Sequence, residues 1–284
     1  MLIGEALREA YKILKDENIE SYMIDSQLLL SKVLNKDKVF IMVNREYELK
    51  EEEEKLFFKY ISLRKNHMPV KYILNQCEFM GLNFYIKEGV LIPRPDTEIL
   101  VEWAIDKIKE EKLIKVCDLC CGSGAIGVSI ATYIKESTVD LYDISKDAIE
   151  VTEKNIRNFS LSNAKVHYSD LLETPIKENK TYDIFLSNPP YIEEKEIDAL
   201  MNDVKNYEPH LALSGGEDGL YFYRNIIKDL YKVLNKGAYI GFEIGYNQGE
   251  AVGKLLDKEG FNNIEVLKDL SGLDRVVTAI YCEE

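Results

Sequence analysis

The stretch from Val116 to Gly127 has the sequence VCDLCCGSGAIG. Its first residues are mostly apolar and predict a short buried strand. Gly122, Gly124 and Gly127 follow in the spacing Gly-x-Gly-x-x-Gly, where a helix is expected to begin. Glycines in such a turn let backbone N–H groups approach a ligand at the helix N-terminus. The stretch therefore predicts the first strand-turn-helix unit of a nucleotide-binding sheet.

From residue 114 onward, predicted strands and helices alternate. The predicted strands are 114–119, 138–143, 164–168, 182–187, 237–244, 262–267 and 275–281, and the main helices are 125–135, 146–159, 217–235 and 247–259. This alternation is typical of a doubly wound, mostly parallel sheet in an α/β protein. Only Lys268 to Asp274 separate the last two strands, which is too short for a helical crossover. We therefore expect the last strand to run antiparallel, as the second arm of a hairpin.

The residues before the sheet have a different character. Apolar residues recur at helical spacing in the first 75 residues, as in Leu7, Ala10 and Leu14. Residues 76–93 contain a turn at Gly81 between extended segments. We therefore predict a helical bundle domain over 1–75, a hairpin linker over 76–93 and an α/β domain over 94–284.

The bulk composition excludes several classes of protein. The chain has 284 residues, of which 46% are hydrophobic and 30% charged, as in globular proteins. A formal net charge of −14 argues against broad nucleic-acid binding, because that needs lysine and arginine to replace phosphate counterions. No apolar run is long enough to span a membrane, and we see no signal peptide. Five cysteines fit a reducing compartment better than a disulfide framework, so we expect a cytoplasmic protein.

Three cysteines, Cys117, Cys120 and Cys121, crowd the glycine turn. Their spacing is compatible with a zinc site or redox chemistry. A zinc site would need a second pair of ligands, and the three histidines of the chain are scattered singly. Buried or loop thiols are the better interpretation, and we predict no metal.

The second predicted strand of the sheet ends in Asp143, about 20 residues beyond the glycine turn. A carboxylate at this point is placed to accept hydrogen bonds from ribose hydroxyls. Its alternative role is to cap the helix that begins near Ser145, and we favour the ribose. NAD and S-adenosylmethionine both carry a ribose that needs such an acid, so these residues do not choose between the two.

The fourth predicted strand ends in a corner, Asn188-Pro189-Pro190-Tyr191. The prolines fix φ and lack N–H groups, so the corner is stiff and its carbonyl groups are free to face outward. It presents a carboxamide, carbonyl oxygens and an aromatic ring where open α/β sheets bind ligands. The alternative is a rigid loop that only ends the strand. A dehydrogenase has no use for this group, whereas an enzyme that methylates a planar nitrogen does.

Several stretches resemble known motifs. Asp118 to Gly124 resembles the first motif of class I S-adenosylmethionine-dependent methyltransferases. Asn188 to Tyr191 resembles a motif shared by adenine-N6 DNA methyltransferases and HemK-like protein-glutamine methyltransferases. Ile92–Glu98 (IPRPDTE), Gly215–Gly219 (GGEDG) and Asp269–Arg275 (DLSGLDR) match the HemK-like (PrmC) pattern. The resemblance covers essentially the whole chain, including the helical N-terminal region.

The resemblance implies a fold and an activity. The fold would be a seven-stranded, Rossmann-like class I methyltransferase sheet, with a helical N-terminal domain that recognises the substrate. The enzyme would methylate the side-chain amide nitrogen (N5) of the glutamine in the Gly-Gly-Gln motif of peptide chain release factors. The methyl donor would be S-adenosylmethionine and the product S-adenosylhomocysteine. Release factors are the implied partners, with no membrane and no direct nucleic-acid binding.

The family pattern also assigns cofactor residues. It places the methionine part along Cys120, Cys121, Gly122, Ser123 and Gly124, the ribose at Asp143, the adenine at Asp170 and Leu171, and Asn188 beside both cofactor and substrate. A capping role is the alternative for Asp170. Cys120 and Cys121 depart from the family, which commonly has glycine and threonine or another small residue there, so the backbone at Cys120 has less freedom in φ.

The corner suggests how an amide can be methylated. An amide nitrogen is a poor nucleophile because its lone pair is delocalised, and its proton is too weakly acidic for a side-chain base. If the side-chain oxygen of Asn188 and the carbonyl of Pro189 each accept one N–H, the lone pair is aimed at the methyl group and the developing positive charge is stabilised. Tyr191 would stack on the planar amide, and Pro190 completes the substrate-binding corner.

Two other functions stay open. A DNA or RNA amino-methyltransferase would use the same corner on adenine or another exocyclic amine, but it needs a basic groove, against which the charge of −14 argues. A non-catalytic or NAD-binding module would use the glycine turn without the corner. Arg94, between two prolines, either presents its guanidinium to a ligand or pairs with Asp96 or Glu98.

Overall fold

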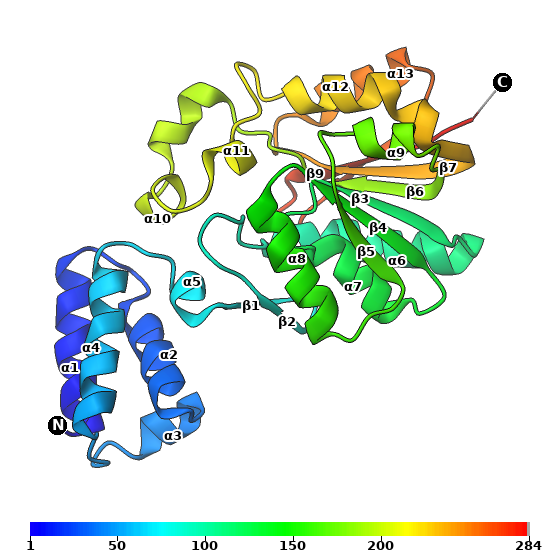
Figure 1. Ribbon diagram of the computed structural model, residues 1–284. Coiled ribbons are helices and arrows are strands. Elements are labelled where there is room, and N and C mark those ends of the chain that lie inside the picture. Colours follow the sequence, from blue (N-terminus) through cyan, green and yellow to red (C-terminus); the bar gives the residue numbers. More distant parts are fainter. Residues whose placement is uncertain (283–284) are drawn as a thin grey trace. The chain divides into compact units, whose positions relative to one another are not determined.

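The computed structural model describes residues 1–282. The chain divides into two compact units, of which the first comprises Met1–Gln76 together with Met201–Tyr207, and the second comprises the other residues from Cys77 onward (Figure 1). None of the described helices is both long and apolar enough to cross a membrane. The domain limits proposed from the sequence at residues 75 and 93 stay a prediction.

The first unit is helical. It contains α1 (Ile3–Asp16), α2 (Tyr22–Leu34), α3 (Lys38–Val43), α4 (Glu51–Lys65) and α5 (Val70–Leu74), and residues 201–207 add the short α10 (Asn202–Lys205). The apolar residues of α1 share one face, so Leu7 and Leu14 are fully buried. Acidic residues suit the positive N-terminus of α4, where the Glu53 carboxylate accepts the N–H of Lys50 at 2.9 Å.

A buried ion pair joins three segments of the first unit. The guanidinium of Arg64, in α4, binds Asp25 of α2 at 2.7 Å and Asp203 of α10 at 2.8 Å. The side chains of Arg64 and Asp25 are only 6% and 5% exposed. Tyr207 donates its hydroxyl to the carbonyl of Asn66 at 2.6 Å. Residues 201–207 are therefore fastened to α4, because a buried charge that loses its partner is strongly destabilising.

The second unit contains a seven-stranded sheet. Its strands are β3 (Lys115–Leu119), β4 (Thr138–Asp143), β5 (Ala164–Tyr168), β6 (Tyr182–Ser187), β7 (Leu234–Glu243), β8 (Asn262–Lys268) and β9 (Asp274–Ile280), in the order β5-β4-β3-β6-β7-β9-β8. Strands β3 to β7 are parallel, whereas β9 runs antiparallel to both β7 and β8. The α/β fold with an antiparallel last strand is therefore confirmed. A separate hairpin of β1 (Gln76–Phe79) and β2 (Leu82–Tyr85) precedes the sheet.

Helices cover both faces of this sheet (Figure 1). One face carries α6 (Glu98–Glu111), α7 (Ala125–Tyr133) and α8 (Lys146–Asn158), and the other carries α9 (Glu173–Lys177), α12 (Tyr221–Leu230) and α13 (Gly249–Lys258). The segment between β6 and α12 forms the turn η2 (Glu194–Ala199) and the short helix α11 (His210–Leu213). The helix expected over 217–235 is shorter than predicted, because a glycine turn precedes α12, and a turn (η3, Tyr231–Val233) leads into β7.

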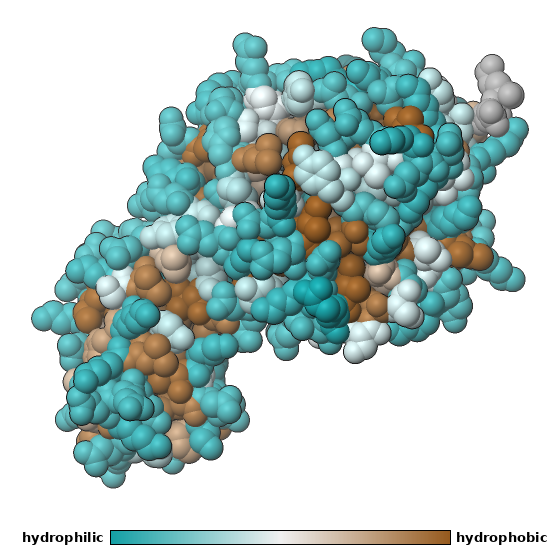
Figure 2. Space-filling view, in the orientation of Figure 1, coloured by the Kyte–Doolittle hydropathy of each residue, from teal (hydrophilic) through white to brown (hydrophobic). Residues whose placement is uncertain are grey.

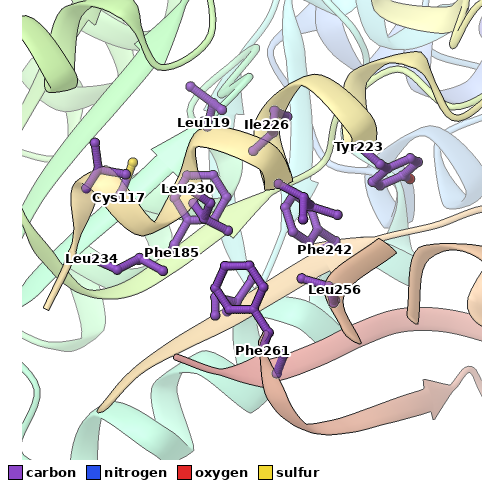
Figure 3. Packing of buried hydrophobic residues seen from close by; sticks show 14 of the residues in the cluster. Cys117, Leu119, Phe185, Tyr223, Ile226, Leu230, Leu234, Phe242, Leu256 and Phe261 are labelled. Carbon is purple, nitrogen blue, oxygen red and sulfur yellow. The ribbon is translucent and has the colours of Figure 1, made fainter. Parts of the chain in front are cut away.

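The core of the second unit is aromatic and aliphatic. Figure 3 shows Phe242 of β7 between Tyr223 of α12 and Leu256 of α13, with Phe185 of β6 in the same cluster. All four side chains are fully buried, and truncating such a residue to alanine costs about 2–5 kcal/mol. The visible face of the unit is largely hydrophilic, with apolar side chains gathered in its middle (Figure 2). This core fixes the strand ends on which the candidate site depends.

Candidate active site

A cavity of about 310 Å³ lies in the second unit, at the carboxyl ends of strands β3 to β6. Its wall includes residues that end or directly follow each of these strands: Cys120 to Ser123, Asp143 to Ser145, Ser169 to Leu171, and Asn188 with Pro190. The sheet order reverses direction between β3 and β6, which is the topological switch point where open sheets bind ligands. The volume is in the range of small-molecule sites.

The glycine turn forms one wall of the cavity. Gly122 and Gly124 have φ of 56° and 79°, in the left-handed region that glycine adopts freely. Cys120 adopts the same region with φ of 60°, which costs a residue with a Cβ about 1–2 kcal/mol. A Cβ on Gly127 would lie 2.6 Å from a methyl of Leu141, so α7 packs against β4 only because this residue is glycine. Two of the glycines thus serve the turn and the third serves the packing of α7.

The carboxylate of Asp143 holds the glycine turn in place. One carboxylate oxygen accepts the N–H of Gly122 at 2.8 Å, and the other accepts the N–H of Ser145 at 2.8 Å. The cap of α8 is instead the hydroxyl of Ser145, which accepts the N–H of Ala148 at 3.3 Å. Burial raises the pKa of Asp143 against the pull of these donors. Each oxygen keeps lone-pair capacity for a hydroxyl in the cavity, which Asp143 lines.

Asp170 and Leu171 line the cavity beyond β5. Leu171 has φ of 44°, an uncommon conformation for a residue with a branched side chain. The hydroxyl of Ser169 holds this turn, because it donates to the carbonyl of Leu171 at 2.6 Å and accepts the N–H of Thr174 at 3.1 Å. Ser169, and not the carboxylate of Asp170, thus accepts this N–H in the first turn of α9. The strained backbone at Cys120 and Leu171 lies in two turns of the same cavity, and backbone strain of this kind is common at functional sites.

Only part of the corner after β6 lines the cavity. Asn188 and Pro190 line the cavity, and the side chain of Asn188 is half-buried. Pro189 is buried and Tyr191 is partly buried, and neither is among the described residues of the wall. The hydroxyl of Tyr191 donates to the Glu243 carboxylate at 3.4 Å. Burial raises the pKa of Tyr191, and it raises that of Glu243 to about 7.

The rest of the wall was not predicted from the sequence. Apart from Arg94, these residues precede α6, belong to the segment between β6 and α12, or begin α12: Gly89, Val90, Leu91, Pro93, Thr97, Pro209, Leu211, Ala212, Tyr221 and Phe222. Most of them are apolar and have no pattern that marks them as ligand-binding. They complete the pocket only because two segments far apart in the sequence meet at the carboxyl ends of the strands.

The partner of Arg94 is Glu208, in the segment between β6 and α12. Its guanidinium binds the Glu208 carboxylate at 2.5 Å, and the other oxygen of Glu208 accepts the N–H of Ile92 at 3.4 Å. The alternative of a pairing with Asp96 or Glu98 is wrong: Arg94 binds Glu208, while Asp96 pairs with Arg275 and Glu98 accepts the N–H of Met80. Glu208 is 1% exposed and Arg94 36%, so the pair anchors the wall and leaves other guanidinium N–H groups at the cavity.

Burial controls the ionisation of the groups beneath the turn. Asp118 accepts the N–H of Gly127 at 2.8 Å, its other oxygen has no partner among the described residues, and burial raises its pKa to about 7. Burial also raises the pKa values of Cys117, Cys120 and Cys121. These three groups are therefore neutral thiols near pH 7, which are poor nucleophiles and poor metal ligands.

The cavity brings together most of the residues predicted from the sequence. The wall contains Cys120, Cys121, Gly122, Ser123, Asp143, Asp170, Leu171, Asn188 and Pro190. Gly124, Pro189 and Tyr191 lie outside the described wall. The carboxamide of Asn188 thus shares one cavity with the glycine turn and the acid that holds it.

Two family models and a close relative match the chain. The PrmC N-terminal domain matches residues 5–74, and the methyltransferase small domain matches residues 96–217. The release factor glutamine methyltransferase of Clostridium acetobutylicum is 52% identical over 281 residues, which cover 99% of each chain. The chain belongs to the release factor glutamine methyltransferase family.

The release factor glutamine methyltransferase family includes more distant relatives of this chain. The member from Bacillus subtilis is 36% identical, covering 98% of this chain and 97% of its own. Among solved structures, the catalytic domain of hMettl16 in complex with MAT2A 3'UTR hairpin 6 has a TM-score of 0.59 at 16% identity, covering 90% of this chain and 93% of that one. At this identity the likeness shows the fold alone. The resemblance to the HemK-like family is confirmed, whereas the roles of individual site residues stay predictions.

Proposed function

We propose that this protein transfers a methyl group from S-adenosylmethionine to the side-chain amide nitrogen (N5) of the glutamine in the Gly-Gly-Gln motif of peptide chain release factors. A relative 52% identical over 281 residues bears the name release factor glutamine methyltransferase. The observation that carries the proposal is that Asn188 lines the same cavity as the glycine turn. The activity would take place in the cytoplasm, where release factors work.

The residues of the cavity fit S-adenosylmethionine. A Cβ added at Gly122 would meet no described atom within 4 Å, so a ligand has room to lie against the backbone of the turn. Asp143 offers a carboxylate for ribose hydroxyls, while Ile144, Leu171 and Phe222 offer apolar surface for a flat ring. Asp170 is exposed at the same wall and can accept from an exocyclic amine. When bound, the cofactor supplies a methyl group on a sulfonium whose leaving group is a neutral thioether.

The chain's own contribution is orientation. The side-chain oxygen of Asn188 and the carbonyl of Pro189 would each accept one N–H of the substrate amide, which aims the nitrogen lone pair into the cavity. Both acceptors bind the nitrogen more strongly as it gains positive charge, so they stabilise the transition state over the ground state. Positioning of this kind contributes about 7–11 kcal/mol in favourable cases.

Two finer roles belong to the same proposal. Tyr191 would stack on the planar amide of the substrate once the glutamine has entered, although its hydroxyl is held at Glu243. Arg94 would present its remaining N–H groups to the substrate backbone at the mouth of the cavity. The net charge of −14 suits a protein substrate better than a nucleic acid.

The proposal is tested with labelled cofactor and a purified release factor. We expect label on the glutamine of Gly-Gly-Gln with the wild-type enzyme, and a loss of about 10²–10³-fold in rate with Asn188→Ala, as for other transition-state hydrogen-bonding groups. Asn158→Ala removes an exposed asparagine from the end of α8 and should leave the rate unchanged. Transfer that persists to a release factor carrying Gln→Ala, or that goes to an adenine oligonucleotide instead, would refute the proposal.

A further inference from the structure

The Asn188–Tyr191 corner is held from behind by a buried carboxamide. Nε2 of Gln248 donates to the carbonyl of Tyr191 at 2.9 Å and to the carbonyl of Gly219 at 3.2 Å. Its Oε1 accepts the N–H of Gly245 at 2.9 Å. Gln248 is 7% exposed, so these bonds are protected from water. One side chain therefore ties together the corner after β6, the glycine turn before α12 and the loop after β7.

The glycine turn before α12 also packs on the corner through its backbone. A Cβ on Gly215 would lie 2.8 Å from Cα of Tyr191, and one on Gly219 would lie 2.4 Å from the carbonyl oxygen of Tyr191. Ile192 donates its N–H to the carbonyl of Leu213 at 3.0 Å and accepts the N–H of Gly215 at 2.8 Å. The motif Gly215–Gly219, to which the sequence assigned no role, thus supports the corner rather than lining the cavity.

Because the corner is stiff, a bond that holds Tyr191 also limits the movement of Asn188 and Pro189. Pro189 and Pro190 have φ fixed by their rings, so few torsions separate the carbonyl of Tyr191 from the carboxamide of Asn188. A backbone held at its far end cannot easily rotate at its near end. Gln248 itself is not among the described residues of the cavity wall, so it has no direct contact with a ligand there.

We propose that Gln248 is a positioning residue for methyl transfer, which sets the place of the Asn188 carboxamide and the Pro189 carbonyl by holding the carbonyl of Tyr191. The proposal rests on the proposed function, because it assigns to Gln248 the geometry on which that reaction depends. A displacement of about 1 Å at a reacting group costs about 10²-fold in rate.

The test compares Gln248→Met with the wild-type enzyme. Methionine has a similar length but makes none of the three hydrogen bonds. We expect kcat for release factor methylation to fall about 10²-fold, while the Kd for S-adenosylhomocysteine stays within about twofold. A kcat within about threefold of wild type, or a Kd that rises in parallel with the loss of kcat, would overturn the proposal.

A matched variant separates positioning from stability. Leu256→Ala removes a fully buried side chain from α13, the helix that begins directly after Gln248, away from the corner. It should lower the melting temperature at least as much as Gln248→Met and leave kcat unchanged below the transition. An equal loss of kcat in both variants would show a merely structural role. If Gln248→Met does not fold, Gln248→Asn, which keeps the chemistry but is shorter, is expected to lower kcat with the Kd unchanged.

Hydrogen exchange gives a readout that needs no activity. The amide of Ile192 is protected by its bond to Leu213. In Gln248→Met we expect faster exchange in the peptide that contains Ile192, and unchanged exchange in β3. Unchanged exchange at Ile192 would overturn the role of Gln248 even if the wild-type enzyme proved to have another substrate, so this failure and that of the proposed function are distinguishable.

Discussion

Among the glycines of the chain, Gly219 is the one at which an added Cβ would make the shortest contact with another atom. Its φ is +71°, and a Cβ there would lie 2.4 Å from the carbonyl oxygen of Tyr191 and 2.6 Å from Nε2 of Gln248. The left-handed backbone costs a residue with a Cβ about 1–2 kcal/mol. Forcing a carbon against a fixed backbone oxygen adds about 1–3 kcal/mol. We therefore expect Gly219→Ala to lower the free energy of unfolding by about 2–5 kcal/mol.

Gly260→Ala provides the matched control for this prediction. Gly260 has φ of +82°, yet a Cβ there would meet no described atom within 4 Å. Its substitution should cost only the backbone part, about 1–2 kcal/mol. The difference between the two variants then measures the clash with Tyr191 and Gln248.

Urea denaturation followed by tryptophan fluorescence is the assay. The single tryptophan of the chain, Trp103, lies in α6, so its signal reports the unfolding of the second unit. Equal losses for Gly219→Ala and Gly260→Ala would refute the reasoning, because the close approach of the glycine turn to the corner would then carry no energy.

Substitutions at three further positions test the site. Cys120→Val should lower the free energy of unfolding by about 2 kcal/mol, measured in urea, because a β-branched residue fits poorly at φ of 60°, whereas Cys120→Gly should stay within about 1 kcal/mol. Asp143→Asn should weaken S-adenosylhomocysteine binding about 10–100-fold by calorimetry, because the amide group turns a donor toward the N–H of Gly122 or Ser145. Glu243→Gln should flatten the fall in stability with rising pH, measured by urea denaturation from pH 5 to pH 8.

The sign of the pH prediction follows from burial. The pKa of Glu243 is raised to about 7 by burial, although Thr97, Arg275 and Tyr191 oppose the shift and Asp96 adds to it. The folded state then binds this proton more tightly than the unfolded state, so stability is lost as pH rises from about 4.5 through 7. The shift corresponds to about 3 kcal/mol.

Each of these predictions has a contradicting result. Burial also raises the pKa of Asp118 to about 7, so Glu243→Gln should keep part of the fall in stability with rising pH. A dependence of stability on pH equal to that of the wild type would contradict the assignment to Glu243. Equal stability of Cys120→Val and Cys120→Gly would contradict the strain at Cys120. A Kd within about twofold of wild type in Asp143→Asn would remove Asp143 from the cofactor site.

Local patterns in the sequence predict the sheet well, because parallel strands buried on both faces require short, continuous apolar runs. The short connection after β8 also predicts an antiparallel last strand. It does not predict that β9 lies between β7 and β8, because either arm of a hairpin can pair with the sheet. The limits of α12 depend on the turn Gly215–Gly219, whose backbone is fixed by its contact with Tyr191.

The candidate site is predictable only where its residues lie at or directly after the ends of strands. Cys120, Asp170 and Asn188 follow strands, Asp143 is the last residue of β4, and all four line the cavity. Glu208 acts on Arg94 across 114 residues of sequence and Gln248 acts on Tyr191 across 57. No local pattern encodes such pairs, because their spacing depends on how intervening elements pack.

The course of the chain through the first unit limits how the protein can be divided or recombined. Met201–Tyr207 belongs to the helical unit, although both flanking segments belong to the second unit. A chimera with one junction near residue 76 would give Arg64 a foreign partner in place of Asp203. Exchange of the helical unit between relatives therefore needs a second, internal graft of residues 201–207. In terms of modularity, residues 1–76 and residues 201–207 form a matched set, and a deletion variant that lacks residues 1–76 alone would leave the Asp203 carboxylate without the guanidinium of Arg64.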